Sequence, residues 1–234
     1  MSLPVRVMTL LVAFAAVVAG AVFIVIHYLL GGPPVVDYTS VASGGQVNVV
    51  LQEDPQNSVT STPDWVSYFV QNPQTKQWVH TFQFKVPEST RVNVTILGYD
   101  GCTPARNNIW SHVEGTIGGT INVQSVDGKG QAGAASNVSN IDTWSHCAVG
   151  HSFAIPALHV YVPVLSPDAS AELCGASPCT SGPHSVEKFS FMTPNHTGVF
   201  RMQCIIPCGG GFLDGFGGPM QTIGFMMGNM EVAA

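Results

Sequence analysis

The sequence contains few charged residues, and basic residues are the scarcest. Only 8 of its 234 residues are Lys or Arg, against 14 Asp or Glu, and the formal net charge at pH 7 is −6. The basic residues occur singly, so no cluster is available to neutralise phosphates or anionic lipid head groups. The composition therefore argues against nucleic acid as a partner.

Signatures of common catalytic sites are also missing. Neither a Ser/His/Asp order, a pair of carboxylates nor a nucleotide-binding motif argues for a hydrolase or a kinase. We therefore do not expect an independent hydrolase or kinase.

The N-terminal region holds a long run without any charge, the 24 residues from Val7 to Leu30. A helix of this length measures about 36 Å, which exceeds the hydrocarbon core of about 30 Å. The apolar part of a cleaved signal peptide, the competing interpretation, is about 7 to 15 residues long. We interpret residues 1–30 as a single-pass anchor in the cell membrane. Arg6 favours a cytoplasmic N-terminus and an extracytoplasmic remainder.

The sequence after the anchor predicts one β-rich domain. Gly31-Gly-Pro-Pro34 ends the helix and begins a linker, which we assign to residues 31–46, followed by a domain over 47–234. Runs with a period of two predict strands, and they lie at 47–52, 78–86, 91–97, 153–164, 186–191 and 198–204. Short strands separated by turn residues are typical of an all-β sandwich or barrel. A long polar insertion covers about 100–143, with a hairpin expected near 120–123.

The six cysteines suggest an oxidising compartment. Cys174 and Cys179 flank a turn-forming stretch, so we predict a local disulfide between them. Cys102 and Cys147, at the two ends of the insertion, are the next natural pair. Six cysteines permit 15 pairings, so this assignment is the most economical of several.

The remaining two cysteines belong to the segment Cys204-Ile-Ile-Pro-Cys208, and Met220 follows after a glycine-rich stretch. Two thiolates, a thioether and an upstream imidazole such as His151 form a ligand set that selects copper over hard cations. Each residue also has a structural interpretation. The two cysteines would form a disulfide, His151 would be a hydrogen-bonded strand residue and Met220 would fill the core.

Four segments of the chain resemble a known family. They read FKVPESTRVNVTILGYD, HSFAIPAL, FSFMTPNHTGVFRMQC and MQTIGFMMGNMEV. Together they resemble the cupredoxins, particularly the copper-bearing domain of cytochrome c oxidase subunit II, over roughly residues 78–232. The resemblance implies a cupredoxin-like Greek-key β-sandwich following the transmembrane helix.

The resemblance also implies a ligand set. His151 matches the first imidazole ligand, Cys204 and Cys208 match the bridging thiolates, and Ile206 matches the residue whose backbone carbonyl binds the metal. The chain departs from the family after the second cysteine. The family's second His and its Met are replaced by Phe212 and Gly215, and no His follows Cys204. Met220 would then close the site through a longer loop, with His184 as another candidate.

The implied function is electron transfer through copper, with the number of ions open, within or beside a membrane respiratory complex. The partners would be subunits of that complex or another redox protein, together with the lipid bilayer around the helix. Two alternatives remain from the sequence. One is a metal-free structural subunit of such a complex, and the other is a copper carrier with exchangeable Cys and Met ligands.

Overall fold

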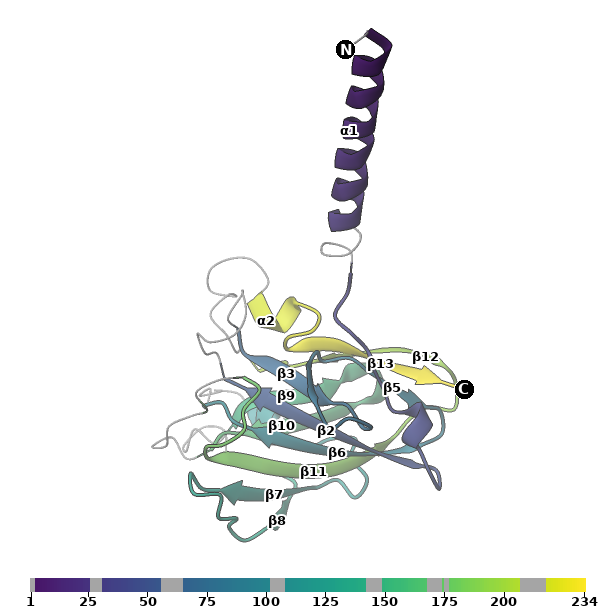
Figure 1. The fold of residues 1–234 in the computed structure, drawn as a ribbon. Coiled ribbons are helices and arrows are strands. Elements are labelled where there is room, and N and C mark those ends of the chain that lie inside the picture. The colour runs from purple at the N-terminus through teal and green to yellow at the C-terminus, as the bar shows by residue number, and fades with distance from the viewer. Residues whose placement is uncertain are drawn as a thin grey trace. The chain divides into compact units, whose positions relative to one another are not determined.

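A computed structural model describes the chain over most of its length, namely residues 3–25, 31–55, 65–101, 108–141, 149–167, 174, 177–206 and 218–234. The chain divides into two compact units, Met1–Gly32 and Pro33–Ala234. Figure 1 shows a helix in the first unit and two layers of strands in the second.

The first unit contains one apolar helix, α1 (Leu3–Ile24). Its stretch Val7–Ile24 has a mean hydropathy of 2.7, and none of it is buried in the protein. The helix is long and apolar enough to cross a membrane, although a signal sequence has the same properties. It therefore fits the predicted single-pass anchor.

The second unit is a sandwich of two sheets (Figure 1). One sheet has the strand order β1 (Val36–Asp37), β5 (Phe84–Pro87), β13 (Met227–Ala233), β12 (Gly198–Gln203), β9 (Val149–Ile155) and β10 (Val160–Leu165). The other has the order β4 (Trp78–His80), β3 (Ser67–Gln71), β2 (Gln46–Asp54), β6 (Arg91–Gly98), β11 (His184–Met192), β7 (Ile121–Val126) and β8 (Ser136–Val138). The predicted all-β sandwich is confirmed.

The core lies between the two sheets and follows the alternation of the strands. In β6, Val92, Val94 and Ile96 are buried, and the residues between them are partly exposed. Phe153 of β9 packs edge-on against Phe82 with ring centroids 5.9 Å apart. The period of two thus selects the face of each strand that enters the core.

Two predicted strands are each divided in the structure. The run 78–86 contributes β4 to one sheet and β5 to the other, so the chain crosses between the layers at Thr81–Gln83. The run 153–164 forms an antiparallel pair, β9 and β10, joined by the 3-10 turn η4 (Pro156–Leu158). Proline has no N–H to donate to a ladder and ends β9, and His159 then reverses the chain with a φ of 54°.

The predicted linker and insertion both contain ordered strands. Within 31–46, β1 pairs with β5, and Tyr38 is almost fully buried. Within 100–143, β7 and β8 pair as an antiparallel hairpin, as predicted near 120–123. The division of the chain at residue 46 remains a prediction.

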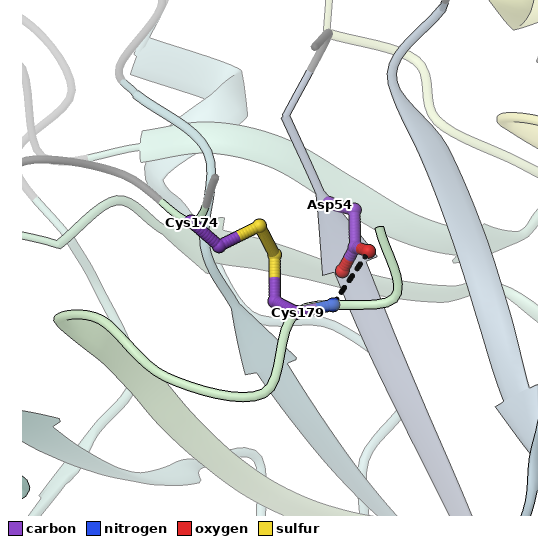
Figure 2. Close-up of side chains that lie close together, drawn as sticks. All are labelled: Asp54, Cys174 and Cys179. Atoms are coloured by element: carbon purple, nitrogen blue, oxygen red, sulfur yellow. Dashed lines mark hydrogen bonds between the residues drawn. A yellow bond between two sulfur atoms is a disulfide. The ribbon is translucent and has the colours of Figure 1, made fainter. Parts of the chain in front are cut away.

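The predicted Cys174–Cys179 disulfide is present, with Cα atoms 5.4 Å apart. Figure 2 shows Asp54 beside it, at the end of β2. The Asp54 Oδ2 atom accepts a hydrogen bond of 3.1 Å from the Cys179 backbone N–H. Cys102, Cys147 and Cys208 lie outside the described residues, so the predicted Cys102–Cys147 pair stays a prediction.

Candidate metal centre

The candidate centre forms where two neighbouring strands bring His151 and Cys204 together. His151 lies on β9, and Cys204 directly follows β12. The two strands are adjacent in one sheet and pair at Gln203 and Ala154. All seven residues of β9 are buried, so its polar side chains, His151 included, face other protein groups rather than water.

Two atoms that can bind metal surround the Cys204 sulfur. The His151 Nδ1 atom lies 3.9 Å from Cys204 Sγ, and the Ile206 carbonyl oxygen lies 3.4 Å from it. His151, Cys204 and Ile206 are each at most 1% exposed. Since an ion holds N, O and S ligands at about 2.0 to 2.3 Å, two ligand atoms on one ion lie no more than about 4.6 Å apart. Both separations from the sulfur are therefore short enough for the sulfur to share one ion with either atom.

Backbone and hydroxyl donors also reach the sulfur. The Ser152 N–H donates to Cys204 Sγ at 3.4 Å, and the Ser152 hydroxyl lies 3.8 Å from the same atom. The hydroxyl is held by the N–H of Ile205, which donates to it at 2.9 Å. Hydrogen bonds to a ligand sulfur tune the redox potential of copper–thiolate sites.

The other side of the imidazole faces two carboxyl groups. The His151 Nε2 atom lies 2.8 Å from Asp100 Oδ2 and 3.2 Å from Glu53 Oε1. Glu53 lies near the end of β2, and Asp100 follows β6. Nε2 thus faces acceptors, whereas Nδ1 faces the sulfur.

These neighbours change the proton affinity of His151. Burial lowers the pKa of His151, but the Glu53 charge, the hydrogen bond to Asp100 and the Cys204 sulfur together outweigh burial and hold the pKa well above its usual value. A proton therefore competes with a metal ion for the imidazole, because a ligand histidine must be neutral.

Met220 lies at the same end of the sheet. It belongs to the short helix α2 (Gly218–Gln221), is partly buried and packs against the core. Its carbonyl oxygen accepts a hydrogen bond of 3.0 Å from the Gln203 side chain, one residue before Cys204. Cys208 lies outside the described residues. His184 instead stacks on Tyr99, with ring centroids 4.6 Å apart.

The sequence analysis did not identify Ser152, Glu53 and Asp100 as parts of this centre. Ser152 is adjacent to His151, and this adjacency was the available signal. Glu53 and Asp100 could not be found by spacing, since each reaches His151 only because the two sheets, formed from strands distant in the chain, stack on each other.

A shallow apolar pocket of about 200 Å³ opens next to the centre. Its lining includes Ile205, Ala154 and Tyr161. The Tyr161 hydroxyl donates a hydrogen bond of 2.9 Å to the Trp110 carbonyl. Ile205, which lines this pocket, directly follows Cys204 in the sequence.

Comparison with known proteins finds similarity among solved structures alone. No family model and no curated protein sequence matches the chain. A structure of the copper protein rusticyanin is 16% identical, covering 82% of this chain and 80% of that chain, with a TM-score of 0.30. Reduced rusticyanin solved by NMR is 15% identical, with 82% and 79% covered and a TM-score of 0.32. Rusticyanin from Thiobacillus ferrooxidans is 16% identical, with the same coverage and a TM-score of 0.29.

Similarity at this level carries no argument about function.

Proposed function

We propose that the protein is a membrane-anchored, cupredoxin-like electron carrier whose copper is held by His151, Cys204 and Ile206. The observation that carries the proposal is the approach of His151 Nδ1 to 3.9 Å and of the Ile206 carbonyl to 3.4 Å from the Cys204 sulfur, in a dry environment. A sulfur, an imidazole nitrogen and a carbonyl oxygen suit copper better than a hard cation. Cys208 and Met220 are the further ligands that we propose from the sequence.

When bound, copper supplies the redox chemistry by cycling between two oxidation states. The protein supplies buried ligands whose backbone is fixed by strand pairing. His151 and Cys204 are held by adjacent strands of one sheet, and Cys204 and Ile206 belong to the hydrophobic core. Ligands that cannot move or take up water change little between the two states, so electron transfer needs little rearrangement.

The burial of the centre bears on the alternative functions. A copper carrier needs ligands that a partner can reach, whereas Cys204 and His151 are 0% and 1% exposed. Burial thus favours electron transfer over carriage. A metal-free structural subunit would need neither the sulfur hydrogen bonds of Ser152 nor an imidazole directed at Cys204.

The apolar helix α1 supports a position at a membrane, where the electron partner would be a respiratory complex of the cytochrome c oxidase type or another redox protein. The pocket at Ile205 is the proposed point of electron exchange, because Ile205 in its lining directly follows Cys204. The helix would keep the domain close to membrane-bound partners.

Copper loading of the full-length protein in detergent tests this proposal. We expect a visible absorption band from the Cys204 sulfur and copper. Cys204→Ser abolishes the band, whereas the double variant Cys174→Ser/Cys179→Ser keeps it, with circular dichroism reporting the fold of both. Absence of copper from the wild-type protein, or an unchanged band in Cys204→Ser, would refute the proposal.

A further inference from the structure

We infer that Asp100 and Glu53 are positioning residues that orient His151 for metal binding. This inference rests on the proposed function for the identity of the metal, but its geometric part concerns the metal-free protein. Both carboxyl groups reach the nitrogen that is turned away from Cys204, at 2.8 Å and 3.2 Å. They act through His151 and not on the metal itself.

The topology explains why these two carboxyl groups meet. Strands β2 and β6 run parallel, with Glu53 opposite Gly98, so both strands end at the same edge of the sheet. The Tyr99 N–H donates to the Glu53 carbonyl at 2.9 Å and extends this pairing by one residue. Asp100 then follows directly. The carboxyl groups thus come from the sheet opposite the one that carries His151 and Cys204.

Each carboxyl group is itself held in place. Asp100 Oδ1 accepts a hydrogen bond of 2.6 Å from the Gly101 N–H, and Glu53 Oε2 accepts one of 3.2 Å from the Asp100 N–H. The free oxygen of each group is left to face His151 Nε2. The side chain of Glu53 is 1% exposed and that of Asp100 is 23% exposed, so water competes weakly for the first and moderately for the second.

A glycine allows β9 to approach the end of the opposite sheet where Glu53 and Asp100 lie, which we call the acidic edge. A Cβ atom on Gly150 would lie 2.4 Å from the Gly101 carbonyl oxygen, which is closer than real contacts permit. Gly150 directly precedes His151, so the close approach at this residue brings the imidazole within reach of Asp100.

The chemical consequence concerns the two ring nitrogens. When Nε2 carries the ring proton and donates a hydrogen bond to a carboxylate, the Nδ1 lone pair remains available to a metal ion. The ring orientation is then defined by the hydrogen bond to Asp100 and the contact with the Cys204 sulfur, with the Glu53 carboxyl group 3.2 Å from Nε2, rather than by packing alone. Loss of such outer partners typically weakens metal binding by about 10- to 100-fold.

Asp54 supplies a matched control. It follows Glu53 on the same strand and is also buried, but it accepts its hydrogen bond from Cys179 beside the disulfide (Figure 2). Asp54→Asn therefore alters a buried carboxyl group of the same strand without removing a contact to His151.

The first experiment uses NMR of the metal-free, full-length protein labelled with ¹⁵N-histidine. We expect a slowly exchanging Nε2 proton for His151, identified by its loss in His151→Gln. The signal disappears in Asp100→Ala, persists in Asp100→Asn, which keeps an acceptor oxygen, and persists in Asp54→Asn. A signal that is unaffected by Asp100→Ala, or that is lost equally in Asp54→Asn, overturns the inference.

The second experiment measures Cu(I) affinity by competition with a chromophoric chelator. Asp100→Ala and Glu53→Ala weaken binding by about 10- to 100-fold, whereas Asp100→Asn and Glu53→Gln restore most of the affinity and Asp54→Asn leaves it unchanged. Equal weakening by Asp54→Asn overturns the positioning role.

Two further outcomes separate the inference from the proposed function. If the wild-type protein binds no copper, the proposed function fails and the NMR result alone decides the orientation of His151. If Zn²⁺ binds to Cys204→Ser and this binding is lost in the double variant Cys204→Ser/Asp100→Ala, the acidic edge is a cation site of its own and the positioning role is wrong.

Discussion

Glu187 should make the stability of the domain fall as the pH rises. This residue lies on β11 and is fully buried, and its Oε1 atom accepts hydrogen bonds from the Leu165 N–H and the Ser185 hydroxyl. Its Oε2 atom has no hydrogen-bond partner among the described residues. Burial raises the pKa of Glu187 from 4.5 to about 8, against the opposing effect of the two hydrogen bonds.

The sign of the effect follows from the direction of this shift. Between pH 4.5 and about 8 the folded protein keeps a proton on Glu187 that the unfolded chain releases. The free energy of unfolding therefore decreases as the pH rises through this window, by up to about 1.4 kcal/mol per pH unit. Across the whole window the loss is on the order of 5 kcal/mol, which is large beside the about 5 to 15 kcal/mol that stabilise a typical protein.

Glu187→Gln removes this dependence because an amide does not titrate. The Gln oxygen can still accept from Leu165 and Ser185, but its NH₂ group meets the position of Oε2, where the described residues offer no partner. An unpaired buried donor costs about 1 to 3 kcal/mol. The protonated carboxyl group of the wild type already has one such donor at Oε2 and the amide has two, so the variant should be somewhat less stable than the wild type at pH 5 and more stable at pH 8.

Urea denaturation of the detergent-solubilised protein measures both free energies. The four Trp residues report unfolding, and the experiment is repeated from pH 5 to 9. Asp54 and Glu53 also have raised pKa values and contribute to the slope of both proteins. The difference between the two curves isolates Glu187, and parallel curves would show that Glu187 is not the group that holds the proton.

Two further predictions concern the metal centre and the anchor. If Met220 is an axial ligand, Met220→Leu shifts the reduction potential of the copper-loaded protein in protein-film voltammetry without preventing copper binding. The control Met230→Leu changes a buried core residue and leaves the reduction potential unchanged. Equal potentials in all three proteins would exclude Met220 as a ligand. If α1 is an uncleaved anchor, mass spectrometry of protein purified from membranes gives the full-chain mass of 24.7 kDa, and a mass lower by the helix would identify a signal sequence.

Local patterns in the sequence were sufficient for much of the architecture. Alternation in β2, β6 and β11 predicted strands because a half-buried strand must expose every second residue. The short spacing of Cys174 and Cys179 predicted their disulfide, since a turn of that size brings the two Cα atoms to a bonding distance. The uncharged run before residue 31 predicted a helix of membrane-spanning length.

The same patterns were insufficient where a segment changes layer or direction. The run 78–86 alternates throughout, yet it serves two sheets, because alternation is a property of each strand and does not reveal which sheet the strand joins. The run 153–164 was predicted as one strand, although Pro156 marks the hairpin that separates β9 from β10.

The sequence by itself determined which residue types could bind a soft metal, since His151, Cys204, Cys208 and Met220 are visible without coordinates. Only the tertiary structure decided that His151 Nδ1 faces Cys204 and that Glu53 and Asp100 face Nε2. The physical reason is that these contacts span 51 to 98 residues of chain and arise from strand pairing and sheet stacking. Local preference specifies each strand, whereas the burial of two sheets against each other specifies which strand ends meet.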